Sequence, residues 1–477
     1  MKCISPPIYK RRYPQKTVLY QVVQNTFLEW SGNYSLRHDE VLPEYVEKEF
    51  KDYFKCGILA HGFARAYCSN CIEDFIVAYS CKKRGVCPSC NTKHMIFITM
   101  HLLEEVLPKL PLRQWVLSVP KWLRYHLTKD APLASQVLRI FIDEIEKQLK
   151  KSCDRITDDA KLGAVSFIQR FGSRLNLHLH FHCVVLDGVF YSDDKGSLQF
   201  ADVYNLGKED SDQVEARVRK RVLSLFKRRE ILTEEQFEEL KSWKGNGGFS
   251  VNADVQIEEH NRRGAERLIR YCARPAFSGE KLTLISEKAE SADITRLQYD
   301  VSKPSQKTES PLTLTATELF DNLAKLIPPP HRHRHHYHGV LAPNSKQRAK
   351  VTQFANHDYR PDAAENMALQ DNLKIEAAAS KLILKPQAKT SSKTWARLIA
   401  KVYEVDPLKC EGCGAQMKLI AFIKDAISIT KILTHLGEEI EAPKMQRARP
   451  PPEEVQVENE IDGYHEPEYE YDQTVSW

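Results

Sequence analysis

The sequence predicts an α+β fold of mixed helices and strands, with a small cysteine-rich domain before it and a small module after it. Three observations support this. Cysteines cluster between residues 56 and 90, residues 95–274 change repeatedly between helical and strand periodicity, and a further cysteine pair at 410 and 413 precedes a helix and an acidic segment. With 477 residues, the chain is long enough for two or three domains that each bury a core.

Hydropathy argues against a membrane or secreted protein. The composition is 42% hydrophobic with a mean hydropathy of −0.47, and no run approaches the ~18 consecutive apolar residues of a membrane span. The basic first residues are followed by no apolar stretch typical of a signal peptide. We therefore expect an intracellular protein that does not contact the membrane.

Charge is distributed unevenly along the chain. The net charge is +5, but residues 453–477 contain nine acids and no Lys or Arg, so that residues 1–452 carry +14. A basic body favours a polyanionic partner, because each neutralised phosphate releases counterions, although many basic proteins bind no polyanion. The acidic segment, placed at 441–477, is predicted to be disordered.

Periodicity and breaker residues give the elements in order. Apolar residues at helical spacing predict helices at 95–107, 132–151, 211–243, 261–274 (stopped by Pro275) and 424–436. Alternation predicts strands at 110–120, 163–171, 178–186 and 251–257, the second and third joined as a hairpin. A Pro/His/Arg loop is expected at 328–338 and a linker at 376–395. The domain boundaries predicted from these elements are 1–95, 96–345, 346–440 and 441–477.

Two cysteine pairs predict a zinc site. Cys68 and Cys71 form one C-x2-C pair, and Cys87 and Cys90 form another that begins sixteen residues later. Two such turns can present four thiolates tetrahedrally to one Zn²⁺, and in a reducing compartment clustered cysteines bind metal more often than they form disulfides. The alternative is four unrelated buried thiols.

Other cysteines leave their roles open. Cys56 and Cys81, with His61 and His94 nearby, could complete a second site or be core residues. Cys410 and Cys413 are either half of a site, a site completed by distant residues, or no site. Three basic residues lie among the cysteines: Lys82, Lys83 and Arg84. They are suited to contact a DNA backbone, although zinc modules also bind proteins.

A histidine-rich strand indicates a second metal site. In LNLHLHFHCVVLDG, strand alternation places His178, His180 and His182 on one face and apolar residues on the other. Same-face neighbours lie about 6.6–6.8 Å apart, so an adjacent pair can share an ion while the outer two cannot. Packing alone is a poor explanation, because buried imidazoles need partners.

The helix at 261–274 offers a nucleophile beside that metal. Tyr271 lies near its end, among arginines that could hold a phosphodiester, including Arg267, Arg270 and Arg274. The alternative is an ordinary amphipathic helix with a solvated basic face. The histidine strand favours the first interpretation, since a metal that polarises a phosphate still requires a nucleophile.

The order of these motifs over about residues 45–440 resembles the insertion-sequence ninety-one family of transposases. The motifs are RAYCSNC, YSCKKRGVCPSCNTKHM, LRQWVLSVPKWLRYHL, GAVSFIQRFGSRLNLHLHFHCVVLDGVF, RLIRYCARP and HHYHGVLAPNSKQRA. The resemblance implies a zinc-binding domain followed by a HUH nuclease domain, named after its His-hydrophobic-His motif, with a central antiparallel sheet flanked by helices.

The resemblance also implies site residues. His180 and His182 correspond to the HUH pair that binds Mg²⁺ or Mn²⁺, His178 is an additional residue that could support them, and no third ligand is assigned. Tyr271 corresponds to the family's first tyrosine. Two-tyrosine members carry another four residues later, where this chain has Pro275, so the chain resembles the single-tyrosine branch.

The implied activity is rolling-circle transposition. Tyr271 would attack single-stranded DNA to form a 5′-phosphotyrosine, with hairpin DNA at element ends and target DNA as partners, in the cytoplasm and nucleoid of a bacterium. The sequence indicates no oligomeric state. Two alternatives stay open: a plasmid replication initiator or relaxase with the same chemistry, and a zinc-dependent DNA-binding protein without catalysis.

Overall fold

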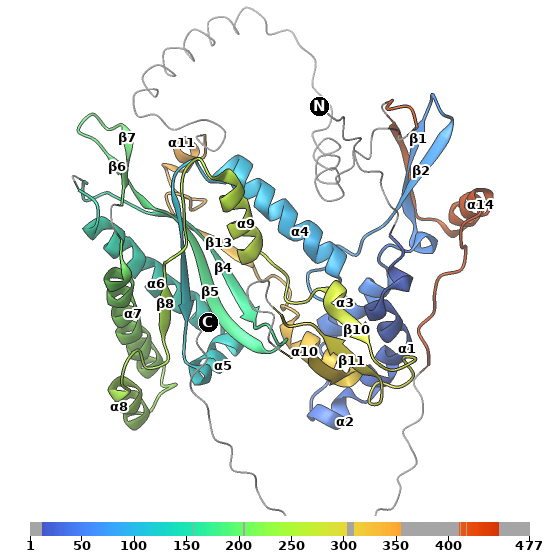
Figure 1. Ribbon diagram of the computed structural model, residues 1–477, viewed down its shortest axis with the longest axis horizontal. Helices are drawn as coiled ribbons and strands as arrows, with labels where there is room; N and C mark the ends of the chain where they lie inside the picture. Colours follow the sequence, from blue (N-terminus) through green and yellow to red (C-terminus); the bar gives the residue numbers. More distant parts are fainter. Residues whose placement is uncertain are drawn as a thin grey trace, which may run out of the picture.

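The chain folds into a central sheet with helices on both faces, joined to a cysteine-rich end (Figure 1). The computed structural model describes residues 12–154, 156–203, 206–302, 310–353, 410, 412–415 and 417–447. The predicted linker at 376–395 and residues 448–477 of the predicted disordered tail lie outside these residues. The α+β class is confirmed.

The central sheet has six antiparallel strands in the order β13-β4-β5-β3-β8, with β9 also paired to β3. Its strands are β3 (Leu112–Ser118), β4 (Gly163–Phe171), β5 (Leu177–Leu186), β8 (Ser250–Asn252), β9 (Gln256–Ile257) and β13 (His335–Gly339). The predicted β4–β5 hairpin is therefore present, and β5 lies near the middle of the sheet, between β4 and β3.

Alternation along β5 assigns the two faces of the sheet. Phe181, Cys183 and Val185 are buried among α6 and α7, whereas Val184 and Leu186 are buried with residues of α9. Figure 1 shows these two sets of helices on opposite sides of the strands. The first face carries α5 (Lys121–Lys129), α6 (Ala131–Lys151), α7 (Lys208–Arg228) and α8 (Glu234–Ser242); the second carries α4 (Pro88–His101), a π-helical turn (Leu102–Val106), α9 (Arg262–Cys272) and α11 (Arg348–Gln353).

A second core joins the N-terminal helices to a segment that follows α9 in sequence. Trp30 donates a hydrogen bond from Nε1 to Asp321 across this core, over 2.8 Å. The packing thus crosses the predicted boundary at 95/96, although the boundaries themselves stay a prediction. The elements are α1 (Val18–Gly32), α2 (Tyr34–His38), α3 (Glu44–Lys55), β10 (Leu282–Leu284), β11 (Arg296–Tyr299), β12 (Leu312–Thr315), α10 (Ala316–Leu326) and the 3₁₀ turns Pro14–Lys16 and Gly279–Lys281.

The C-terminal module forms part of the cysteine-rich end. Strand β14 (Lys418–Ile423) pairs with β1 (Phe63–Cys68), which also pairs with β2 (Glu73–Ala78). Helix α14 (Ala426–Leu436) buries Ile429 and Leu433 against Leu59 and Phe63. The remaining elements are the hairpin β6 (Gly188–Ser192)–β7 (Leu198–Asp202) and the 3₁₀ turn Leu59–His61.

Three element predictions are wrong in detail. The strand expected at 251–257 is two short strands, β8 and β9, which pair separately with β3. The single helix expected at 211–243 is two helices, because Thr233 starts α8 by accepting a hydrogen bond from the Gln236 amide at its Oγ1, over 3.2 Å. The loop expected at 328–338 ends in β13, whose Tyr337 packs against the core under α9. Within the described residues, no helix is long and apolar enough to cross a membrane.

A buried ion pair fixes β3 against the end of β5. The Nε and Nη2 atoms of Arg113 each donate to the Asp187 carboxylate over 2.8 Å, and both residues are buried. Asp187→Asn should therefore lower the free energy of unfolding by about 3–5 kcal/mol, because Arg113 would keep a buried charge without its counterion. Chemical denaturation would measure the change. The matched control Asp143→Asn removes an exposed partner of Arg221 and should cost less than about 1 kcal/mol, so equal costs would contradict the argument.

Candidate functional site

Four cysteine thiols meet at the end of α3. Cys56 caps this helix, and its Sγ lies 3.7 Å from Cys90 Sγ and 3.6 Å from Cys87 Sγ, while Cys81 Sγ lies 3.5 Å from Cys90 Sγ. Hydrogen bonds from Cys56, Cys81 and Cys87 lower the pKa of the Cys90 thiol. A close group of thiols that favours a thiolate is suited to zinc.

A second group of four thiols joins β1 to the C-terminal module. Cys68 Sγ lies 3.6 Å from Cys413 Sγ, and Cys71 Sγ lies 3.6 Å from Cys410 Sγ. The Cys71 backbone amide lowers the pKa of the Cys68 thiol to about 7. All four sulfur atoms lie within 4.8 Å of one another, as they do in the first group.

The predicted grouping of Cys68 and Cys71 with Cys87 and Cys90 in one site is wrong. Each pair instead joins a different cluster: Cys87 and Cys90 meet Cys56 and Cys81, and Cys68 and Cys71 meet Cys410 and Cys413. The reason is strand pairing, because β14 pairs alongside β1 and brings the distant C-x2-C pair to Cys68. Of the alternatives left open for Cys410 and Cys413, a site completed by distant residues matches this arrangement.

The three histidines of β5 form a row on the face covered by α9. Their ring centroids are 5.0 Å apart for His178 and His180, and 4.8 Å apart for His180 and His182. Burial lowers the pKa of His180 to about 4 and that of His182 to about 3, which keeps both rings neutral at pH 7. Neutral imidazoles are the form that binds metal.

Hydrogen bonds orient these rings. The His178 carbonyl can only accept, so His180 donates to it from Nδ1 over 2.9 Å and keeps the lone pair on Nε2. His182 Nδ1 lies 2.8 Å from the Gln114 amide, and its Nε2 is buried without a hydrogen-bond partner among the described residues. His180 Nε2 is thus available for a cation. Gln114 Nε2 can only donate, so His182 Nδ1 accepts from it and the neutral ring carries its proton on Nε2. A cation at His182 Nε2 requires the Gln114 amide to turn so that Oε1 accepts from Nδ1–H, and the two imidazoles then form a donor set that suits a divalent metal.

Tyr271 lies directly against this row. Its ring centroid is 5.4 Å from that of His182 at 86°, and the side chain is 47% exposed, so DNA could reach its hydroxyl. Gln169 on β4 holds the end of α9 by donating to the carbonyls of Tyr271 and Cys272 over 3.1 and 2.9 Å.

The basic residues expected to contact DNA have different environments. Arg274 lies 4.8 Å from the Tyr271 ring, Arg270 pairs with Glu266 over 2.7 Å, and Arg267 is exposed. Their contact with DNA stays a prediction.

The basic residues of the cysteine-rich loop also differ. Lys82 is exposed, and Lys83 pairs with Asp52 over 3.1 Å. Arg84 donates to the Arg332 carbonyl over 3.0 Å. DNA contact by these three residues likewise stays a prediction.

Sequence reasoning missed Gln114 and Gln169. Both are buried on strands that flank β5, at 6% and 3% exposure, and Gln169 lies opposite His180 in the β4–β5 register. The available signal was a glutamine inside each apolar strand, since a buried amide needs partners. Among the described residues, no cluster of three or more His, Cys, Asp or Glu ligand atoms contains these histidines.

Two protein-family models match the chain. A transposase zinc-binding domain model matches residues 27–119, and the Y2_Tnp transposase family model matches residues 163–349. No curated protein and no solved structure matches the chain. The fold and both matches define a transposase with an N-terminal zinc-binding domain, and the two cysteine clusters support structural zinc. The order of the two matches, a zinc-binding domain followed by a transposase domain, is consistent with an IS91-family transposase.

Proposed function

We propose that this transposase cuts and rejoins single-stranded DNA at the ends of a mobile element through Tyr271. The adjacency of the Tyr271 ring to His182 is the observation that carries the proposal. A phenol beside two neutral imidazoles and a guanidinium has the parts needed for phosphodiester cleavage: a nucleophile, a metal-binding pair and a cation for the phosphate.

In the proposed reaction, Tyr271 Oη loses its proton and forms a bond to phosphorus. The bond from phosphorus to the 3′-oxygen breaks, and that oxygen takes up a proton, which leaves a 5′-phosphotyrosine and a free 3′-hydroxyl. His180 and His182 would hold Mg²⁺ or Mn²⁺, which would polarise the scissile phosphate. Attack by the hydroxyl of another strand end reverses the exchange and rejoins DNA, so no energy-rich cofactor is required.

Zinc would have a structural role in recognition. We infer that each four-thiol cluster binds one Zn²⁺ and that the cysteine-rich end contacts hairpin DNA at the element ends. Both clusters lie away from the histidine row in sequence and share no residue with it.

A labelled-DNA experiment tests the activity. The purified chain, with its zinc content verified, is incubated with 5′- or 3′-labelled single-stranded DNA from the element ends, with Mn²⁺ or without divalent cation. We expect a metal-dependent covalent adduct that carries the DNA segment 3′ of the cut. If no end sequence gives an adduct but the protein still binds the DNA, the chain acts as a binding protein instead.

Gln114 should affect metal affinity through His182. Gln114→Leu removes the hydrogen-bond partner of His182 Nδ1 and substitutes an apolar side chain of similar length. We expect the Mn²⁺ concentration for half-maximal adduct formation to rise about 10–100-fold. Gln213→Leu, on the exposed surface of α7, is the control. An unchanged Mn²⁺ requirement in Gln114→Leu would remove Gln114 from the site.

A further inference from the structure

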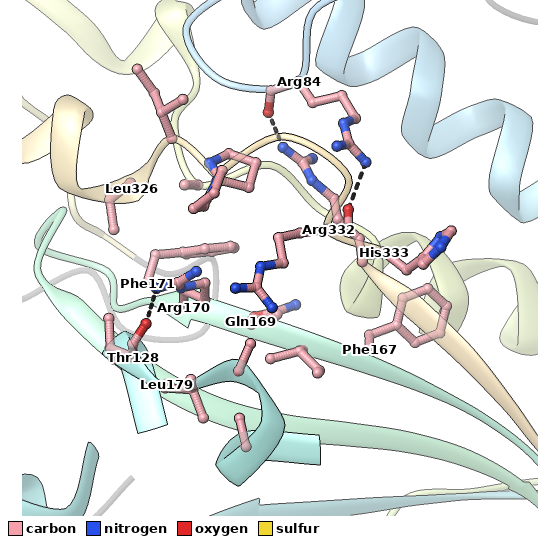
Figure 2. A pocket seen from close by; sticks show the side chains of 18 of the residues that line it. Arg84, Thr128, Phe167, Gln169, Arg170, Phe171, Leu179, Leu326, Arg332 and His333 are labelled. Carbon is pink, nitrogen blue, oxygen red and sulfur yellow. Dashed lines mark hydrogen bonds between the residues drawn. The ribbon is translucent and has the colours of Figure 1, made fainter. Parts of the chain in front are cut away.

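A cavity of about 270 Å³ lies beside the end of α9 and the end of β4. Its walls come from the cysteine-rich loop at Arg84 and Gly85, from the end of β4, from the segment after α9, and from residues 328–334. Figure 2 shows Arg84 and Arg332 on one side and Gln169, Arg170 and Phe171 on the strand side. The cavity therefore joins parts of the chain that are distant in sequence.

The lining is strongly cationic. It contains six cationic side chains and no carboxylate: Arg84, Lys129, Arg170, Arg274, Arg332 and Arg334. The Nε atoms of Arg170 and Arg274 are buried without a hydrogen-bond partner in the described part of the chain. Buried donors without acceptors are costly, so this lining is suited to an anion that supplies acceptors.

The chain holds these cations together despite their repulsion. Burial and the neighbouring Arg84 lower the pKa of Arg334 to about 10. Arg334 donates to the Arg84 carbonyl, and Arg170 donates to the Thr128 carbonyl over 2.6 Å. The loop itself is fixed because the Glu49 carboxylate accepts from the Gly85 amide over 3.0 Å. The cationic lining is thus built by specific contacts.

Apolar groups line the same cavity. Phe171, Phe277, Pro328 and Pro329 face it, and the Arg274 guanidinium lies 5.4 Å from the Phe171 ring. A bare phosphate would use only the cations, whereas a nucleotide would also use these flat apolar surfaces for its base. The volume is near the lower limit of small-molecule sites, which suits a single nucleotide.

The cavity also adjoins the end of α9, next to Tyr271. Gln169 lines it and donates to the Tyr271 carbonyl, and Arg274 contacts the Tyr271 ring. We propose that the cavity receives one unstacked nucleotide of the strand that Tyr271 cuts, with its phosphate on the arginines and its base against Phe171. This inference rests on the proposed function for the identity of that strand.

Binding and cross-linking test the inference without cleavage. The full-length Tyr271→Phe chain, loaded with zinc, is titrated with fluorescent hexathymidylate, and a 5-iododeoxyuridine version is photo-cross-linked and mapped by mass spectrometry. We expect cross-links at Phe171 or residues 328–333. Arg170→Ala combined with Arg332→Ala should weaken binding at least about 10-fold and reduce the salt dependence by roughly one phosphate contact.

Two further variants separate the contribution of base stacking from the general effect of removing an arginine. Phe171→Leu should weaken hexathymidylate binding about 5- to 100-fold, because the base loses its stacking partner. Inorganic phosphate should displace the oligonucleotide from wild type only when phosphate is in large excess over the oligonucleotide. Arg228→Ala removes an exposed arginine on α7, on the opposite face of the sheet, and should bind within twofold of the unsubstituted chain. Zinc content and melting temperature confirm that each variant is folded.

The outcomes separate the two proposals. If wild type forms the covalent adduct but the double variant binds normally and cross-links map elsewhere, the cavity inference is wrong and the proposed function stands. If cross-links map to the cavity but no end sequence gives an adduct, the nucleotide site stands and the proposed function fails. Displacement by inorganic phosphate at concentrations equal to the oligonucleotide would overturn a nucleotide site in favour of an anion site.

Discussion

Tyr271→Phe is expected to abolish the covalent protein–DNA adduct, a loss of at least about 10³-fold in its rate of formation. The substitution removes only the hydroxyl, so the ring can keep its contact with His182, at 5.4 Å, and with Arg274. No other group can form the phosphotyrosine bond at this position. Denaturing gels with labelled single-stranded DNA and Mn²⁺ would measure the adduct over time.

Controls separate chemistry from folding in this experiment. Tyr125→Phe alters an exposed tyrosine on α5 and should form the adduct at the wild-type rate. The Tyr271→Phe chain should still bind the same DNA with an affinity close to that of wild type. A persistent adduct in Tyr271→Phe would move the nucleophile to another residue, and peptide mapping of that adduct would locate it.

The row of histidines on β5 and the buried face of α9 could be predicted from local patterns. Alternation in a strand fixes which side chains share a face, so the row of His178, His180 and His182 follows from the sequence alone. The amphipathic pattern of α9 likewise places Leu268 and Ile269 in the core. Neither pattern gives the distance between the strand and the helix, because that distance depends on tertiary packing.

Long-range pairings could not be predicted in the same way. Spacing identifies C-x2-C pairs but not which pairs meet, and the partner of Cys68 and Cys71 lies more than 300 residues away. Strand β13 was missed because HHYHG is read as a polar loop until its pairing with β4 is known. The packing of α10 on α1 also depends on contacts between distant segments.

Substitution of one cysteine in each cluster should remove one zinc ion in both cases but lower the stability by different amounts. Wild type should contain two zinc ions per chain, and both Cys87→Ser and Cys413→Ser should contain one, because each removes a ligand from a different cluster. Cys87 and Cys90 lie in the core that holds the N-terminal helices, whereas Cys413 is exposed. Cys87→Ser should therefore cause the larger loss of stability. That loss should be a part of the ~10–16 kcal/mol of free energy with which a structural site binds zinc.

Metal analysis combined with thermal unfolding distinguishes the two clusters. Cys153→Ser, a buried cysteine outside both clusters, is the control and should keep two zinc ions. Because Arg84 lies on the loop between Cys81 and Cys87, Cys87→Ser should also weaken hexathymidylate binding, while Cys413→Ser should leave it nearly unchanged. A wild-type content of one zinc, lost in Cys87→Ser and kept in Cys413→Ser, would instead show that only the cluster of Cys56, Cys81, Cys87 and Cys90 binds zinc.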